Sequence, residues 1–450
     1  MKAKFSSKIG LIAATVGSAV GLGNVWRFPA EVQENGGAAF LLIYVLCVIV
    51  LGIPVMLSEF SLGRAGGSDA VGTFKNLSPK RPWWITGLIG LVASYLILCF
   101  YMVVAGWTLE YTVQSITGEL YKPIEGMDLQ GSFATHMQEY IEGSDSPLIF
   151  TYIMIGMNLA ILVGGVSKGI ERISNLLMPL LFLLLLIFCC VSLSLPDSAK
   201  GLSYFFNPDF SKITPHVIIN ALGQAFFSLS LGMGILITYA AYYPKSADLR
   251  KTAFTVSALD LLVAILMGII IFPAVLSFGL EGESLRSITL VFVTLPEVFN
   301  NMSLTCLWSS LFFITLSVAA ITSTISISEV SIAFLQDRFK MSRTKACVIV
   351  LGSCAVFSTL CSLSLTKGSS LIICGMPLFD LLDKVATNIL LPICSLLICI
   401  YAGWIAPRGL MISQLTNDGS LKGSLCGFML FCIKYVAPPA ITIILISPYL

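Results

Sequence analysis

The sequence predicts an all-α integral membrane protein with eleven spanning helices, two of them broken near mid-length. Of its 450 residues, 56% are hydrophobic and only 11% are charged, and the mean hydropathy is +0.92. In soluble domains, about a quarter of the residues are charged. Glycine clusters interrupt two of the apolar segments, at residues 18–24 and 228–234. These observations exclude an ordinary soluble fold and predict a membrane protein with two broken helices.

The predicted spans follow one another along the whole chain. Runs of about 20 apolar residues, the length that a helix needs to cross a bilayer, occur at 9–29, 38–63, 85–113, 148–164, 170–195, 215–241, 251–279, 303–335, 342–363, 377–405 and 424–446. The first run carries Arg27 and has no cleavage site of small residues, so we expect a permanent helix rather than a signal peptide. The fifth span carries Gly169, directly before this run, and Pro179 within it. Proline removes a helical hydrogen bond, so this half of the helix either opens readily or holds a static kink.

Charge predicts the orientation of the spans. With the N-terminus inside, 18 of the 26 Lys and Arg residues lie in cytoplasmic segments, as the positive-inside rule requires. Eleven spans then leave the C-terminus outside. Because five is odd, spans 1–5 and 6–10 cross the membrane in opposite directions. We therefore expect a first inverted repeat over 1–195, a second over 215–405, and an accessory helix at 424–446.

The two broken segments predict a binding site. Glycine costs about 1 kcal/mol against alanine inside a helix, and unpaired backbone groups at membrane depth need protein or a cavity to satisfy them. Breaks in the first helix of each half of the chain are typical of transporters that bind substrate and ions at the midplane.

Polar side chains beside the breaks indicate cation sites. Asp260 lies about 13 Å into its span, counted from residue 251 at 1.5 Å per residue, and Asn24 and Ser228 reach a similar depth. Their oxygens are hard ligands that suit alkali cations; the alternative is a cluster of hydrogen bonds between helices. Thr322 and Ser323 could form a second cation site, or they could only join helices.

Other polar residues predict gates and a carboxylate contact. Arg27 and Asp383 are placed to pair across the external pathway. Lys2 and Asp337 stand in the same relation on the cytoplasmic side, where a solvated surface pair worth little is the alternative. Tyr101 has a hydroxyl that needs a partner when buried, and a bound carboxylate would serve.

Several motifs together carry a family resemblance. They are GSAVGLGNVWRFP at 17–29, ENGG at 34–37, GIP at 52–54 with Glu59, GR at 63–64, GQAFFSLS at 223–230 and FDLLD at 379–383. With these motifs the chain resembles the neurotransmitter:sodium symporter family over spans 1–10, and within it most resembles bacterial transporters of hydrophobic amino acids. The resemblance implies a leucine-transporter-like fold, a 5+5 inverted repeat with helices 1 and 6 broken.

The resemblance also implies site residues. A first sodium ion would bind Ala19, Asn24, Ser228 and Asp260 with the substrate carboxylate, and a second would bind Gly17, Val20, Ala319, Thr322 and Ser323. The substrate would contact Ser18, Ala19, Gly21, Leu22, Gly23, Ile97, Tyr101, Phe227, Ser228, Ser230, Met233, Ser323 and Ile327. Arg27 with Asp383 would form the outer gate, and Lys2 with Asp337 the inner one.

Some positions depart from the family pattern. Lys2 replaces the usual inner-gate arginine, which makes a bidentate pair there doubtful, and Phe5 replaces a tryptophan. Asp260 stands where many relatives have asparagine. Gly21 occupies the position of the aspartate in monoamine carriers, which favours a substrate that brings its own carboxylate.

We therefore expect a sodium-coupled secondary active symporter that imports hydrophobic and aromatic L-amino acids by alternating access, independently of chloride and with two Na⁺ ions. We expect a bacterial inner-membrane protein that is not an enzyme. Its partners would be an amino acid and the lipid bilayer, with no nucleic acid and no oligomer implied. The alternatives are an amino-acid receptor on the same fold that does not transport, and a sodium-permeable channel.

Overall fold

The computed structural model describes residues 4–123, 129–143, 145–279, 287–421, 423 and 425–447, and almost all of this chain is helical. Two long helices form the centre, α6 (Trp84–Thr117) and α16 (Thr305–Phe339), with 72% and 83% of their most apolar stretches buried. Both are apolar around much of their circumference, which is typical of a helix enclosed by other helices.

Among the described residues, nine helices are long and apolar enough to cross a membrane, and the bent first pair makes ten. With the sixth, which is interrupted at its break, eleven helical stretches correspond to the predicted spans. In order they are α1 (Lys8–Ala19), η1 (Gly23–Arg27) and α2 (Phe28–Glu34); α3 (Ala38–Cys47), η2 (Val48–Gly52) and α4 (Ile53–Gly66); α6; α8 (Ser146–Val163); η4 (Val166–Glu171) and α9 (Arg172–Leu193); α11 (Pro215–Ser228) and α12 (Ile235–Ala240); α13 (Leu249–Ser277); α16; α17 (Arg343–Ser364); α18 (Leu378–Val385), η7 (Ala386–Leu390), α19 (Leu391–Ile400) and η8 (Tyr401–Ile405); and α21 (Cys426–Phe431), η9 (Cys432–Val436) and α22 (Ala437–Ile446). All eleven agree with the predicted runs to within five residues at each end.

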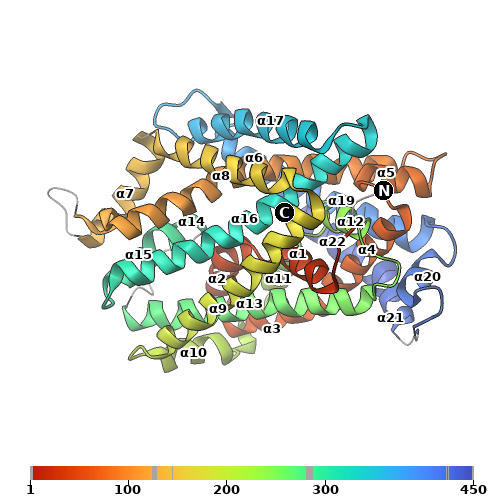
Figure 1. The fold of residues 1–450 in the computed structure, drawn as a ribbon. Helices are drawn as coiled ribbons and strands as arrows, with labels where there is room; N and C mark the ends of the chain where they lie inside the picture. The colour runs from red at the N-terminus through yellow and green to blue at the C-terminus, as the bar shows by residue number, and fades with distance from the viewer. Residues whose placement is uncertain are drawn as a thin grey trace.

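Shorter elements lie at the two ends of this bundle. They are α5 (Ala70–Leu77), η3 (Glu119–Tyr121), α7 (Leu129–Gly143), α10 (Ser198–Phe206), η5 (Phe210–Lys212), α14 (Ser287–Thr289), η6 (Leu290–Thr294), α15 (Leu295–Asn300), α20 (Leu410–Thr416), and the antiparallel strands β1 (Ile372–Ile373) and β2 (Met376–Pro377). Figure 1 shows α7, α10 and α15 at one end, and α5, α20 and the N-terminus at the other. The segments predicted to be outside thus gather opposite those predicted to be inside.

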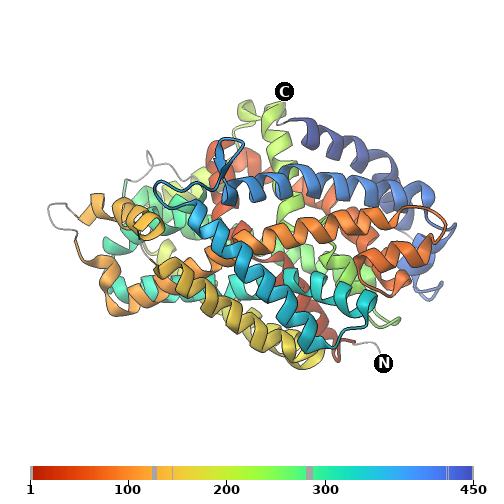
Figure 2. The ribbon, with the colours of Figure 1, turned by 90° about the horizontal axis from the view of Figure 1, so that it is seen from above.

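Both predicted breaks are present and lie in the middle of the bundle. The first span bends by 53° between Lys8–Ala19 and Gly23–Glu34. The sixth loses its helix between Ser228 and Ile235, where Ser230, Gly232 and Gly234 have φ of 53°, 78° and 72°. Positive φ is open to glycine at little steric cost, so the glycines explain why the chain unwinds here. Figure 2, turned by 90°, shows the N-terminus and the C-terminus on opposite sides of the helical bundle.

Candidate functional site

The first predicted cation site is a compact group of oxygens at the breaks. The Asp260 carboxylate on α13 accepts hydrogen bonds from Asn24 Nδ2 at 2.8 Å and from Ser228 Oγ at 2.7 Å. The Tyr44 hydroxyl lies 3.4 Å from the same carboxylate and 3.2 Å from Ser228 Oγ. All four side chains are buried. The carboxylate, amide and hydroxyl oxygens form a donor set that fits a hard cation.

The broken first helix adds backbone groups to this cluster. Asn24 Oδ1 accepts from the Gly21 amide at 3.3 Å, so the side chain of Asn24 joins the break in its own helix to Asp260 on another. Ala19 is buried at the end of α1, where helical carbonyls lack partners in the next turn. The structure thus brings together Asn24, Ser228 and Asp260, and it places Ala19 at the end of the helix that leads into the same break.

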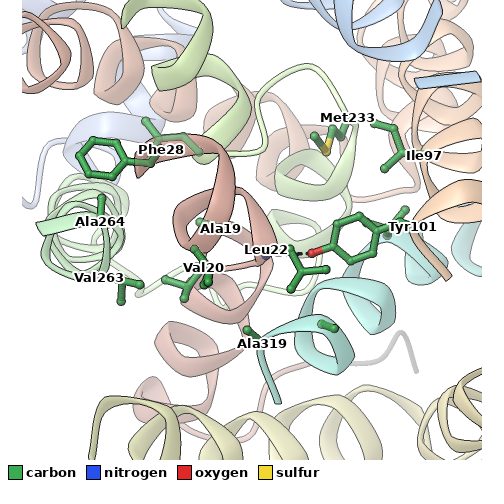
Figure 3. Close-up of a cluster of buried hydrophobic side chains, with 14 of the residues drawn as sticks. Ala19, Val20, Leu22, Phe28, Ile97, Tyr101, Met233, Val263, Ala264 and Ala319 are labelled. Atoms are coloured by element: carbon green, nitrogen blue, oxygen red, sulfur yellow. Dashed lines mark hydrogen bonds between the residues drawn. The ribbon is translucent and has the colours of Figure 1, made fainter. Parts of the chain in front are cut away.

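The second predicted cation site lies between α1 and α16. Ser323 Oγ donates to the Val20 carbonyl at 3.4 Å, and Thr322 Oγ1 donates to the Ala319 carbonyl at 3.0 Å. A methyl group on Gly17 would lie 3.2 Å from Thr322 Cβ. The helices therefore approach closely enough for carbonyl and hydroxyl oxygens of both to surround one ion. Figure 3 shows Val20 and Ala319 facing each other across this contact.

Next to these groups, the predicted carboxylate position is defined by Tyr101 and the first break. The Tyr101 hydroxyl accepts a hydrogen bond from the Leu22 amide at 3.0 Å, drawn as the dashed line in Figure 3. A Cβ added to Gly21 would lie 2.5 Å from Ser323 Oγ and 3.1 Å from the Tyr101 hydroxyl. Only a residue without a side chain fits there without displacing Ser323 or Tyr101.

Apolar side chains line the other side of this position. Ile97 and Met233 are both buried and belong, with Tyr101, to the cluster drawn in Figure 3. Ile327 is buried on α16. Phe227 is partly exposed, and its ring would lie 2.6 Å from a Cβ on Gly23. A zwitterion with an apolar side chain matches this division into a polar and an apolar half.

The unwound part of the sixth span is fixed from two sides. Ser230 Oγ donates to the Ser18 carbonyl at 2.8 Å, which joins the two breaks directly. The Gly232 amide donates to Glu59 Oε1 at 2.8 Å. Glu59 therefore satisfies a backbone amide of the unwound segment. Ser18 Oγ itself donates to the Thr15 carbonyl.

The predicted outer-gate residues line one cavity. This cavity of about 440 Å³ extends from Gly23 and Tyr101 to Lys384, and both Arg27 and Asp383 border it. The Arg27 guanidinium lies 4.5 Å from the centre of the Phe227 ring and 3.6 Å from Glu31 Oε1. Arg27 thus pairs with Glu31 in this state, across the same opening from Asp383.

On the side predicted to be cytoplasmic, Lys2 lies outside the described residues. Its predicted partner Asp337 accepts from Ser68 Oγ at 2.8 Å and from the Asp69 amide at 3.0 Å. Phe5 is buried and packs edge-on against Tyr239, with ring centres 5.8 Å apart. This aromatic contact closes the inner end of the first span.

Sequence reasoning missed two ionic groups on this side. Glu329 is bound bidentately by Arg343 at 2.8 and 2.7 Å. Glu171 accepts four hydrogen bonds from Ser6 and Ser7. The available signal for Glu171 was an acidic residue within an apolar run; its partners are far away in sequence, so the pattern alone could not find them.

Comparisons with known proteins agree with this architecture. The family model described as the sodium:neurotransmitter symporter family matches residues 2–124 and 133–449. An uncharacterized sodium-dependent transporter of Bacillus subtilis is 33% identical over 449 residues, which cover 99% of this chain and 97% of the relative. One of Haemophilus influenzae is 33% identical over 459 residues, with 98% and 97% covered.

A solved structure is similar over the same length. The crystal structure of MhsT in complex with L-phenylalanine matches with a TM-score of 0.89 and 38% identity, covering 99% of this chain and 100% of that one. The eleven spans, the paired breaks and the full-length family match lead to one conclusion: the chain belongs to the sodium:neurotransmitter symporter family, a family of transporters rather than enzymes, and has its leucine-transporter-like fold.

Proposed function

We propose that this protein imports hydrophobic and aromatic L-amino acids together with sodium, by alternating access. The observation that carries the proposal is the carboxylate position at Tyr101 and Gly21, which lies between the Asp260 oxygen cluster and an apolar wall containing Ile97 and Met233. The substrate carboxylate would complete the first cation site, so ion and substrate would bind together. MhsT, solved with L-phenylalanine, supports an aromatic substrate.

Two sodium ions fit the two oxygen clusters, around Asp260 and around Thr322. Each charge that moves inward gains about 2.3 kcal/mol per 100 mV of membrane potential, so two ions would drive strong accumulation of a neutral zwitterion. We assign 1–195 and 215–405 to the two inverted repeats and place the N-terminus in the cytoplasm of a bacterial cell and the C-terminus outside.

Uptake by proteoliposomes tests the substrate class. Radiolabelled leucine, phenylalanine and tryptophan should accumulate with a sodium gradient and compete with one another. Competition by glycine or alanine alone would contradict the pocket assignment. Sodium-dependent binding without counterflow would instead identify a receptor, and a linear flux that does not saturate would identify a channel.

We further propose that transport does not need chloride. Asp260 supplies a fixed negative charge within 3.4 Å of Tyr44 and hydrogen-bonded to Ser228, where a bound anion would otherwise balance the cation. Replacing chloride by gluconate should leave uptake unchanged, and Asp260→Asn should lose transport or become sensitive to anions. Asp209→Asn, in an exposed loop, is the matched control. A sharp fall of wild-type uptake in gluconate would refute the proposal.

A further inference from the structure

A buried carboxylate ties the beginning of the first span to the beginning of the fifth. Glu171 ends η4, and both of its carboxylate oxygens are used. Oε2 accepts from the Ser6 amide at 2.8 Å, while Oε1 accepts from Ser6 Oγ at 2.8 Å, the Ser7 amide at 3.0 Å and Ser7 Oγ at 2.7 Å. Hydrogen bonds to an ionised group are stronger than neutral ones, so this is a strong attachment for two short segments.

The attachment reaches directly into the first helix. Ser7 is the N-cap of α1, and its hydroxyl accepts from the Gly10 amide at 2.9 Å while donating to Glu171. A Cβ on Gly10 would overlap the Glu171 side chain. The carboxylate therefore lies against the first turn of α1, where the helix dipole also favours a negative charge.

The helical turn that carries Glu171 is irregular, which favours a change of conformation there. It is a π-helical turn, Val166–Glu171, which is rarer and less regular than an α-helical turn. Within it, a side chain on Gly169 would overlap the Ile161 carbonyl. Further along the same span, Pro179 lies inside α9 and removes another backbone hydrogen bond. Unwinding of this turn would carry Glu171 away from both serines at once.

The same pair of helices also reaches the second candidate cation site. Gly10 lies against Glu171, and Gly17 lies against Met178, whose Cε would be 3.6 Å from a Gly17 Cβ. Each helix thus advances seven residues, or about 10 Å, between the two contacts. Gly17 in turn contacts Thr322. One packed interface therefore joins the serines to the group of oxygens around Thr322.

We propose that Glu171 is a positioning residue that holds the cytoplasmic end of the first helix closed and releases it when the fifth helix unwinds. The inference rests on the proposed transport cycle, because it assigns the release to the step that opens the inner side. Glu171 contacts no substrate or ion in this role. It acts through Ser6, Ser7 and the helix that follows them.

Hydrogen–deuterium exchange on the purified full-length protein in sodium buffer tests the proposal. Glu171→Ala should make amides in 4–19 and in 164–180 exchange about tenfold faster, since breaking charged hydrogen bonds favours local opening. The double variant with Ser6→Ala and Ser7→Ala should also exchange faster in these two segments. Combining all three changes should add little to Glu171→Ala alone, because they remove one interaction. Lys168→Gln, on the exposed side of the same turn, should leave exchange unchanged.

The sodium dependence of exchange gives the second readout. In the wild type, sodium in place of potassium should protect both segments, and the Glu171→Ala protein should lose most of this protection. Faster exchange in only one segment, additive effects of the serine and glutamate changes, or faster exchange spread through α6 and α16 would each overturn the proposal. Hydrogen–deuterium exchange needs no transported substrate. If amino-acid uptake fails but sodium and Glu171→Ala still change exchange in both segments as expected, the result counts against the proposed function alone.

Discussion

The Tyr101 hydroxyl shows how one atom can serve both the protein and a ligand. It accepts from the Leu22 amide and retains its own proton, which can be donated to a carboxylate. Removing it leaves a buried amide with one fewer partner and takes away a donor to the ligand.

We predict that Tyr101→Phe weakens substrate binding about tenfold, because a hydrogen bond to a charged group contributes roughly 1.5–3 kcal/mol. Equilibrium binding of labelled phenylalanine in sodium buffer measures this. Tyr95→Phe is the control, since its hydroxyl donates to Ser353 on α17, outside the candidate pocket. Equal losses in the two variants would mean that the Tyr101 effect is not local.

Gly23 allows a second prediction at this scale. Its missing side chain leaves room for the Phe227 ring, which would lie 2.6 Å from a Cβ. Gly23→Ala should displace that ring and lower uptake at least about tenfold, as overpacking of a close contact disturbs its neighbours. Gly352→Ala on α17, where a Cβ meets nothing within 4 Å, should transport normally. Normal uptake by Gly23→Ala would show that the ring moves freely.

At the scale of elements, Pro179 divides the fifth span. We predict that Pro179→Ala slows transport while equilibrium substrate binding stays nearly intact, because alanine restores a backbone donor in a helix that does not line the candidate pocket. Binding and uptake on one preparation decide this, with the exposed Leu183→Ala as control. Equal losses in both assays would indicate a role in folding, and unchanged uptake a passive kink.

The N-cap of α5 predicts a pH dependence. Asp69 accepts from the Val71 and Gly72 amides at 2.9 and 3.2 Å. Burial raises the pKa of this carboxyl above its ordinary value, and nearby Asp337 adds to the rise. The folded state therefore binds more protons than the unfolded state, and stability falls as pH rises from about 4, the ordinary aspartate pKa, through the raised value.

Asp69→Asn keeps a capping oxygen and removes the charge. We predict that its melting temperature equals that of the wild type at acidic pH and exceeds it at pH 8, as measured by thermal unfolding in detergent. Asp69→Ala, which loses the cap as well, should be less stable than Asp69→Asn at both pH values. If the melting temperature of the wild type rises relative to that of Asp69→Asn as the pH increases, the charge of Asp69 stabilises the fold and the prediction is wrong.

The sequence could predict the elements better than the contacts between them. The apolar runs gave all eleven spans because bilayer thickness sets helix length, and glycines marked the breaks because only they adopt positive φ cheaply. The oxygens of Asn24, Ser228 and Asp260 could be grouped from their depth beside the breaks, whereas the sequence left open whether Thr322 and Ser323 bind a cation or only join helices. Arg343 with Glu329, and Glu171 with the serines, depend on which helices pack together, and no local pattern in one sequence encodes this.

At the scale of the whole molecule, exposed thiols test the predicted orientation. Cys374 is exposed in the turn between β1 and β2, where it and Gly375 have φ of 53° and 78°; positive φ at both central residues is typical of a tight hairpin. We predict that a membrane-impermeant maleimide labels Cys374 on intact cells. In a protein whose exposed Cys306 and Cys374 are replaced by serine, Ser420→Cys, in the exposed loop after α20, should be labelled only after permeabilisation. The opposite pattern would invert the topology.

The position of Arg27 has a consequence for the energy of the whole transport cycle. Its guanidinium lies on the Phe227 ring beside Glu31, and Asp383 borders the same cavity. If Asp383 pairs with Arg27 in the closed state, closing replaces Glu31 by Asp383 as the carboxylate partner. The Arg27 guanidinium meanwhile stays on the Phe227 ring. Such an exchange has nearly equal energies on its two sides, so the outer closure itself supplies little work. The bound ions and substrate then decide which state is populated, and the arginine follows their occupancy rather than driving it.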